Sequence, residues 1–99
     1  MEEWENMPYI RKEDREKLNP ILNQLAKALQ SFPLENLDGV LNYCITYLLK
    51  SLYQPRYFNY NRAIGVLESA KLEFYRIVVA QYEDKKRLEH GDVEGYAGQ

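Results

Sequence analysis

The sequence predicts an all-α fold, a three- to four-helix antiparallel bundle with a long C-terminal helix. Apolar residues recur at intervals of three and four over three long segments, with proline and asparagine between those segments. No segment shows the sustained alternation of a half-buried strand. The chain has 99 residues, 45% of them hydrophobic, which fills one modest core and leaves no room for a second.

The expected domain covers most of the chain. We expect residues 1–7 to be a flexible acidic leader, residues 8–90 a single helical domain, and residues 91–99 a flexible tail. Pro8 opens a short extended piece, because proline fixes φ and lacks an N–H. Residues 11–18 carry charges of both signs and predict one or two helical turns.

The first main helix is expected to start at Asn19 and Pro20. Asparagine is a good N-cap, and proline is favoured at the first helical position. Pro33 ends the helix, because it biases Phe32 away from the α region. The apolar positions of this helix are Ile21, Leu22, Leu25, Ala28, Leu29 and Phe32.

The second helix has the most regular pattern. Asn36 or Asp38 is expected to cap its start, and Pro55 to end it. We expect Cys44, on its apolar face, to be a small buried hydrophobe. The repeating positions are Leu37, Val40, Leu41, Cys44, Ile45, Leu48, Leu49 and Leu52.

The third helix is predicted from Tyr60 to about Arg87, with Asn59 as its N-cap and Gly91 as its stop. Its apolar positions cover an arc wider than one neighbouring helix needs. The helix is therefore either central between the other two or partly buried against another chain. One stripe contains Ala63, Ile64, Leu67, Ala70, Phe74, Ile77, Val78 and Gln81, and the other contains Gly65, Leu72, Tyr75, Val79 and Tyr82.

The composition argues against several function classes. A single cysteine and a single histidine exclude an intrachain disulfide and a Cys/His zinc site. No phosphate-binding loop, nucleophile elbow or dinucleotide glycine pattern is present. We therefore expect no catalytic residue, no metal and no cofactor. These observations together disfavour an enzymatic function. The acidic N-terminal residues lack the pattern of a signal peptide, which favours a cytoplasmic protein. No apolar run reaches ~18 residues, so we expect no membrane-spanning helix.

The start of the third helix is the candidate binding site. Asn59, Asn61 and Arg62 would combine free backbone N–H groups with a cation, an arrangement that suits an anion. Tyr57 and Glu68 complete this set. These five residues support a protein that binds a nucleotide or another anion. If such a protein is an enzyme, it would be a metal-dependent hydrolase. An arginine beside a capping asparagine is common, however, so a purely structural role of these two residues is favoured.

The same region bears on nucleic acid. Residues 50–62 hold three cations, four aromatic side chains and no acid, a combination that often binds single strands. The net charge of the chain is -2, however, whereas phosphate binding normally needs a basic surface. We therefore expect no nucleic-acid partner, and expect the aromatic side chains to fold the loop over one end of the bundle.

Several segments resemble a family of small uncharacterised helical proteins of bacteria, archaea and their viruses. They are Met7-Pro-Tyr-Ile-Arg-Lys-Glu-Asp-Arg, Leu41-Asn-Tyr-Cys-Ile-Thr, Tyr57-Phe-Asn-Tyr-Asn-Arg-Ala-Ile-Gly-Val-Leu-Glu, Glu73-Phe-Tyr-Arg, Tyr82-Glu-Asp-Lys and Gly91-Asp-Val. The resemblance covers about residues 7–93. It implies a compact all-α protein and no known activity.

The second stripe of the third helix is the candidate interface. Leu72, Tyr75, Val79 and Tyr82 lie on it, and tyrosines at the edge of an apolar stripe are typical of subunit contacts as well as of core borders. Most soluble oligomers are symmetric dimers. The sequence therefore favours a homodimeric interaction or scaffold domain in which these residues are buried only in the assembly.

Overall fold

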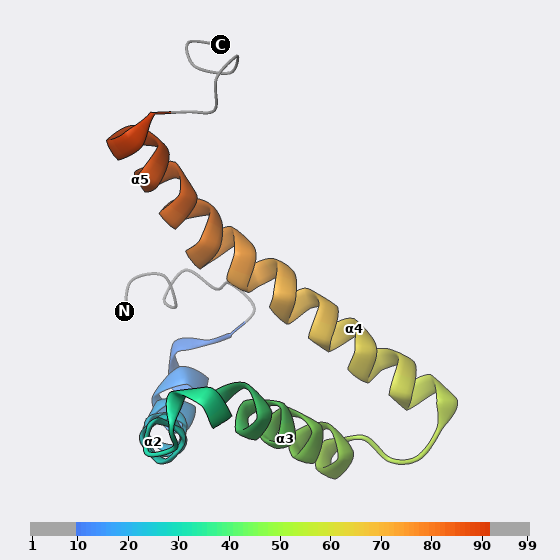
Figure 1. Cartoon of the computed structure of the whole chain (residues 1–99). Coiled ribbons are helices and arrows are strands. Elements are labelled where there is room, and N and C mark those ends of the chain that lie inside the picture. The colour runs from blue at the N-terminus through green and yellow to red at the C-terminus, as the bar shows by residue number, and fades with distance from the viewer. Residues whose placement is uncertain (1–9, 92–99) are drawn as a thin grey trace. The chain divides into compact units, whose positions relative to one another are not determined.

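The computed structural model describes residues 10–91, which are all-α and contain no strand. Three helices follow one another in this part of the chain: α2 (Lys12–Gln30), α3 (Leu34–Leu52) and a long third helix (Figure 1). The third helix consists of α4 (Tyr57–Phe74), a π-helical segment η1 (Tyr75–Val79) and α5 (Ala80–His90). The all-α prediction with a long last helix is confirmed, and residues 10–91 form three helices. The expected leader and residues 92–99 of the expected tail lie outside the described residues.

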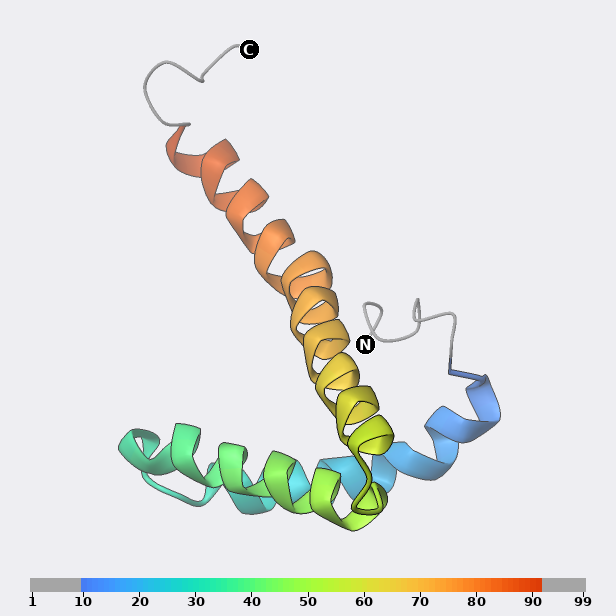
Figure 2. The same ribbon diagram turned by 90° about the vertical axis from the view of Figure 1, so that its right-hand side faces the viewer.

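The chain divides into two compact units, Met1–Tyr60 and Asn61–Gln99. In the first unit α2 and α3 contact each other, and the chain runs in opposite directions along them (Figure 2). The turn between them is held by backbone bonds. The Ser31 N–H donates to the Ala28 carbonyl at 3.2 Å, and the Phe32 N–H donates to the Leu29 carbonyl at 3.2 Å. The two helices therefore form a hairpin closed by a short turn.

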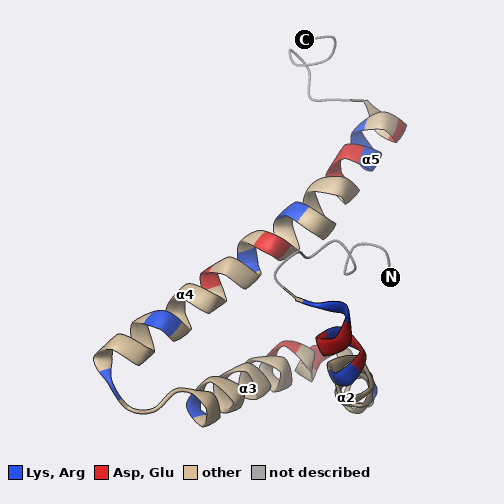
Figure 3. Ribbon diagram, turned by 180° about the vertical axis from the view of Figure 1, so that it is seen from behind, with Lys and Arg blue, Asp and Glu red and all other residues tan. Residues whose placement is uncertain are grey.

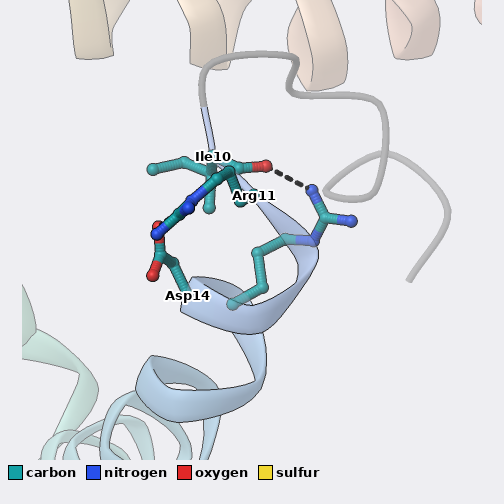
Figure 4. Close-up of polar contacts among 4 residues, drawn as sticks. Ile10, Arg11 and Asp14 are labelled. Carbon is teal, nitrogen blue, oxygen red and sulfur yellow. Dashed lines mark hydrogen bonds and ion pairs between the residues drawn. The ribbon is translucent and has the colours of Figure 1, made fainter.

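The helix α2 starts eight residues before the predicted position. The Arg15 guanidinium donates to the Ile10 carbonyl at 2.8 Å, and Arg11 pairs with Asp14 at 3.2 Å. Figure 4 shows Ile10, Arg11 and Asp14 at this end of the helix. Pro20 lies inside the helix, so the predicted start at Asn19 and Pro20 is wrong. Residues 12–18 are mostly Lys, Glu, Arg and Leu, which favour helix strongly enough to extend it through the proline.

The helix α3 begins at Leu34, directly after Pro33, and has no side-chain cap. Asn36 and Asp38 lie within it, so the prediction that either caps its start is wrong. The Asn36 N–H instead donates to the Pro33 carbonyl at 2.9 Å. The helix ends at Leu52, three residues before Pro55, the residue that was predicted to end it. Charged side chains stand only near the two ends of α3, and residues 39–49 carry none (Figure 3).

The long third helix begins at Tyr57 and ends at His90. It starts three residues earlier than predicted, so Asn59 lies in its first turn and is not its N-cap. Gly91 stops the helix as predicted: its φ is 84°, a conformation that favours glycine, and its N–H donates to the Arg87 carbonyl at 2.8 Å. At 1.5 Å per residue the 34-residue helix is about 51 Å long.

The π-helical segment interrupts the regular turn of this helix. The Ala80 N–H donates to the carbonyl of Tyr75, five residues back, where an α-helix would use the residue four back. The turn thus holds one extra residue. Residues beyond it are rotated by about 100° relative to an uninterrupted α-helix. The two apolar stripes drawn from the sequence assumed an unbroken helix, and the positions after Val79 therefore have a different phase.

Few side chains are buried. Among residues 10–91 only Ala63 and Ile77 are, whereas Leu34 is 84% exposed and Leu52 is 73% exposed. Cys44, expected to be buried, is half-buried. A side chain that is exposed in the whole chain is also exposed in its own unit. Neither unit therefore covers its apolar side chains by itself.

Candidate functional site

The connection between α3 and α4 positions the predicted binding residues. The Tyr53 N–H closes α3 on the Leu49 carbonyl at 3.1 Å. Two donors then converge on the Gln54 carbonyl: the Arg56 N–H at 2.8 Å and the Asn59 side-chain amide at 3.2 Å. The Asn59 side chain thus hydrogen-bonds to the loop and does not cap the N–H groups of the helix.

The predicted anion site assumed free N–H groups from Asn59 to Arg62. The structure moves the helix start to Tyr57, and the Tyr60 N–H donates to the Arg56 carbonyl at 2.9 Å. In an α-helix the N–H groups of Asn61 and Arg62 donate to carbonyls four residues back. The N–H groups of Tyr60, Asn61 and Arg62 are therefore used inside the helix and are not open to an anion.

The five candidate binding residues do not share one face of α4. At about 100° per residue, Tyr57, Asn61 and Glu68 lie on one side, and Asn59 and Arg62 lie on another. Glu68 is also 11 residues from Tyr57, about 16 Å along the axis.

The charges further along α4 are paired locally. Glu68 lies 3.2 Å from Lys71, and both side chains are largely exposed. Arg76 and Glu73 are 2.7 Å apart, again three residues along the helix. Glu73 is half-buried, and the other three side chains are exposed. Ion pairs between neighbouring turns at a helix surface contribute about 0.3–0.5 kcal/mol each.

The four candidate interface residues lie in or near the π-helical segment. Leu72, Tyr75 and Tyr82 are exposed, and Val79 is half-buried. The Tyr75 hydroxyl donates to Glu83 Oε1 at 2.9 Å. This hydrogen bond and the Glu83 charge raise the pKa of Tyr75 above its ordinary value of 10.0. Sequence reasoning missed Glu83, because residues eight apart in a regular α-helix are separated by about 80° around the axis and about 12 Å along it, too far for a direct hydrogen bond to be expected.

No group of three or more His, Cys, Asp or Glu side chains that could hold a metal ion exists among residues 10–91. Two carboxylates of α5 lie beside cations: Asp84 is 3.3 Å from Arg87, and Glu89 is 3.3 Å from Lys86. The Lys86 ammonium also lies 5.5 Å from the centre of the Tyr82 ring. The charges of α5 thus form local pairs along the helix.

Comparison with known families identifies the chain. The family described as "Domain of unknown function (DUF6899)" matches residues 7–93. The chain belongs to this family. The match has the extent expected from the sequence resemblance and carries no activity with it. Neither the curated proteins nor the solved structures contain a match.

A membrane-spanning helix would have to be long and uniformly apolar. Within the part of the chain that the structure describes, no helix meets both conditions.

Proposed function

We propose that this member of the DUF6899 family is a homo-oligomeric interaction domain in which the long helix packs against a second copy. The observation that carries the proposal is exposure: side chains such as Ile64, Leu72 and Tyr75 are more than half exposed. Apolar patches of this kind mark interaction surfaces in soluble proteins. A cytoplasmic location is part of the proposal, supported by the single cysteine.

Helix length supports a second chain as the partner. Each helix of the α2–α3 hairpin has 19 residues, about 28 Å, against about 51 Å for the 34-residue helix. A hairpin of that length is too short to cover the whole long helix. A second copy supplies a helix of matching length, and closed symmetric dimers are the commonest oligomers.

The test is the mass of the native assembly with and without a charge at Val79. Native mass spectrometry or light scattering should give a dimer for the unmodified chain at micromolar concentration. Val79→Glu should dissociate it, because an unpaired carboxylate would be desolvated in the interface. Gln81→Glu, which adds the same charge two residues on at an exposed position, is the matched control and should remain dimeric. A monomeric unmodified chain would overturn the proposal.

A further inference from the structure

One face of the long helix carries eight residues whose spacing is symmetric about Ile77. Positions 64, 68, 71 and 75 are separated by four, three and four residues. Positions 79, 83, 86 and 90 repeat the same spacing on the other side of Ile77. The eight residues, called the Tyr75 face below, are Ile64, Glu68, Lys71, Tyr75, Val79, Glu83, Lys86 and His90.

The π-helical segment is what brings these residues to one face. From Lys71 to Glu83 the spacing is four residues three times, and each such step drifts by about 40° in an α-helix. The extra residue of η1 removes most of that drift. The hydrogen bond of 2.9 Å between the Tyr75 hydroxyl and Glu83 shows directly that these two positions lie together. The segment Tyr75–Val79 is itself centred on Ile77.

The Tyr75 face is accessible for most of its length. Ile64 and Tyr75 are exposed, as are the side chains of Glu68 and Lys71, whereas Val79 and Lys86 are half-buried. Ile77, at the centre of the pattern along the axis, is buried. Leu72 and Tyr82 flank the face and add exposed apolar surface beside it.

The charges on this face are complementary to the same charges on a second copy when the two helices run antiparallel. When a second copy runs antiparallel with its two-fold axis at the level of Ile77, Glu68 meets Lys86 of the copy and Lys71 meets Glu83 of the copy. At the centre, Tyr75 meets Val79. A parallel, in-register pair would instead place each of the four charges opposite its own copy, and like charges directly opposed destabilise a helix pair.

We propose that two copies of the chain pair antiparallel through the Tyr75 face, with the two-fold axis at Ile77. This inference rests on the proposed self-association and adds the face, the direction and the register. A symmetric pair of this kind buries the same patch of each copy. Tyr75 and Val79 form its apolar centre, and the charged layers on either side set the direction.

Cysteine cross-linking tests the direction. In a Cys44→Ser background, a Glu68→Cys chain is refolded together with a Lys86→Cys chain and oxidised. We expect a mixed cross-linked dimer, and none from either chain alone, because equivalent positions lie about 27 Å apart in the antiparallel pair. Lys17→Cys, an exposed position on α2, mixed with Lys86→Cys is the control and should give none.

Charge reversal gives a second, independent readout. Glu68→Lys should raise the dissociation constant of the dimer about two- to thirty-fold, because the symmetric dimer loses two ion pairs between Glu68 and Lys86, each of ordinary surface strength. Adding Lys86→Glu should restore the affinity, because the reversed charges again meet.

The outcomes separate the two proposals. Cross-linking of Glu68→Cys with itself, or a dimer without the mixed cross-link, would overturn the antiparallel register and leave self-association standing. A monomer in native mass spectrometry would overturn both.

Discussion

The Tyr75 hydroxyl and the Glu83 carboxylate form a hydrogen bond across the π-helical segment, 2.9 Å long and open to solvent. The bond needs the protonated hydroxyl, so it and the neighbouring negative charge raise the pKa of Tyr75. A raised pKa in the folded state means that the stabilisation is complete below about pH 10 and is lost as the pH rises through the raised pKa.

Glu83→Gln should therefore lower the pKa of Tyr75 towards 10.0, because it removes both the charged acceptor and the negative charge. The measurement is an NMR titration of the tyrosine rings between pH 8 and pH 12. Glu35→Gln, on α3, is the control and should leave the Tyr75 titration unchanged. An unchanged Tyr75 pKa in Glu83→Gln would show that the bond does not form in solution.

Asn59 illustrates what a single residue type leaves undecided. Asparagine caps helices and also closes turns, since its amide both donates and accepts. Its position before an apolar run favoured a helix cap. The structure uses its donor on the Gln54 carbonyl instead, because the loop places that carbonyl beside the first turn of α4.

At the scale of the element, Pro20 is the clearest departure from the sequence prediction. A proline inside a helix removes the N–H that would donate to the Glu16 carbonyl and costs about 3 kcal/mol. The local signal of Asn19 and Pro20 therefore favoured a helix start. The continuous helix Lys12–Gln30 shows that the helix-forming residues on either side outweigh it.

Pro20→Ala should stabilise the protein by about 2 kcal/mol, because it removes the ~3 kcal/mol cost of an interior proline but gives the unfolded chain up to ~1 kcal/mol more conformational freedom. Urea denaturation monitored by circular dichroism measures this. Asn19→Ala distinguishes the two helix starts: inside a helix it is neutral or slightly stabilising, whereas at an N-cap it costs about 1 kcal/mol. A loss of stability in both variants would contradict the continuous helix.

The π-helical segment has no signal in the pattern of apolar residues. The 3.6-residue period predicted one long helix and its end at Gly91, because those depend on local preferences and on a glycine that can take a positive φ. Whether one turn accepts an extra residue depends on competing backbone hydrogen bonds of similar energy. The sequence therefore predicted the length of the helix but not the phase of its last third.

At the scale of the whole molecule, the proposed dimer predicts that stability depends on association, because pairing would bury apolar side chains that each unit leaves open. When two copies fold and pair together, the melting temperature rises with protein concentration. For a dimer of this size the expected rise is about 3 °C for each tenfold increase in concentration. Calorimetry over a hundredfold range measures it, with Val79→Glu as the comparison that should lose the dependence. A melting temperature independent of concentration in the unmodified chain would contradict the dimer.

The candidate binding site was predictable only as a list of residues. Tyr57, Asn61 and Glu68 share one side of α4, and Asn59 and Arg62 share another, a division that follows from a helix start three residues earlier than expected. Helix ends depend on a few weak contacts in the adjoining loop, such as the two donors on the Gln54 carbonyl. The sequence pattern is least informative there.

The sequence by itself determined the all-α class, three helical segments, an end of the second helix before Pro55, the stop at Gly91 and the family extent of residues 7–93. These follow from periodicity and from single residues with strong backbone preferences. That residues 8–90 form one domain stays a prediction. Only the tertiary structure decided that α2 runs through Pro20 and that Tyr75 and Glu83 share a face. In both places the local sequence preference and the hydrogen bonds of the folded helix favour different conformations. The free-energy difference between them decides the outcome, and the sequence pattern does not give that difference.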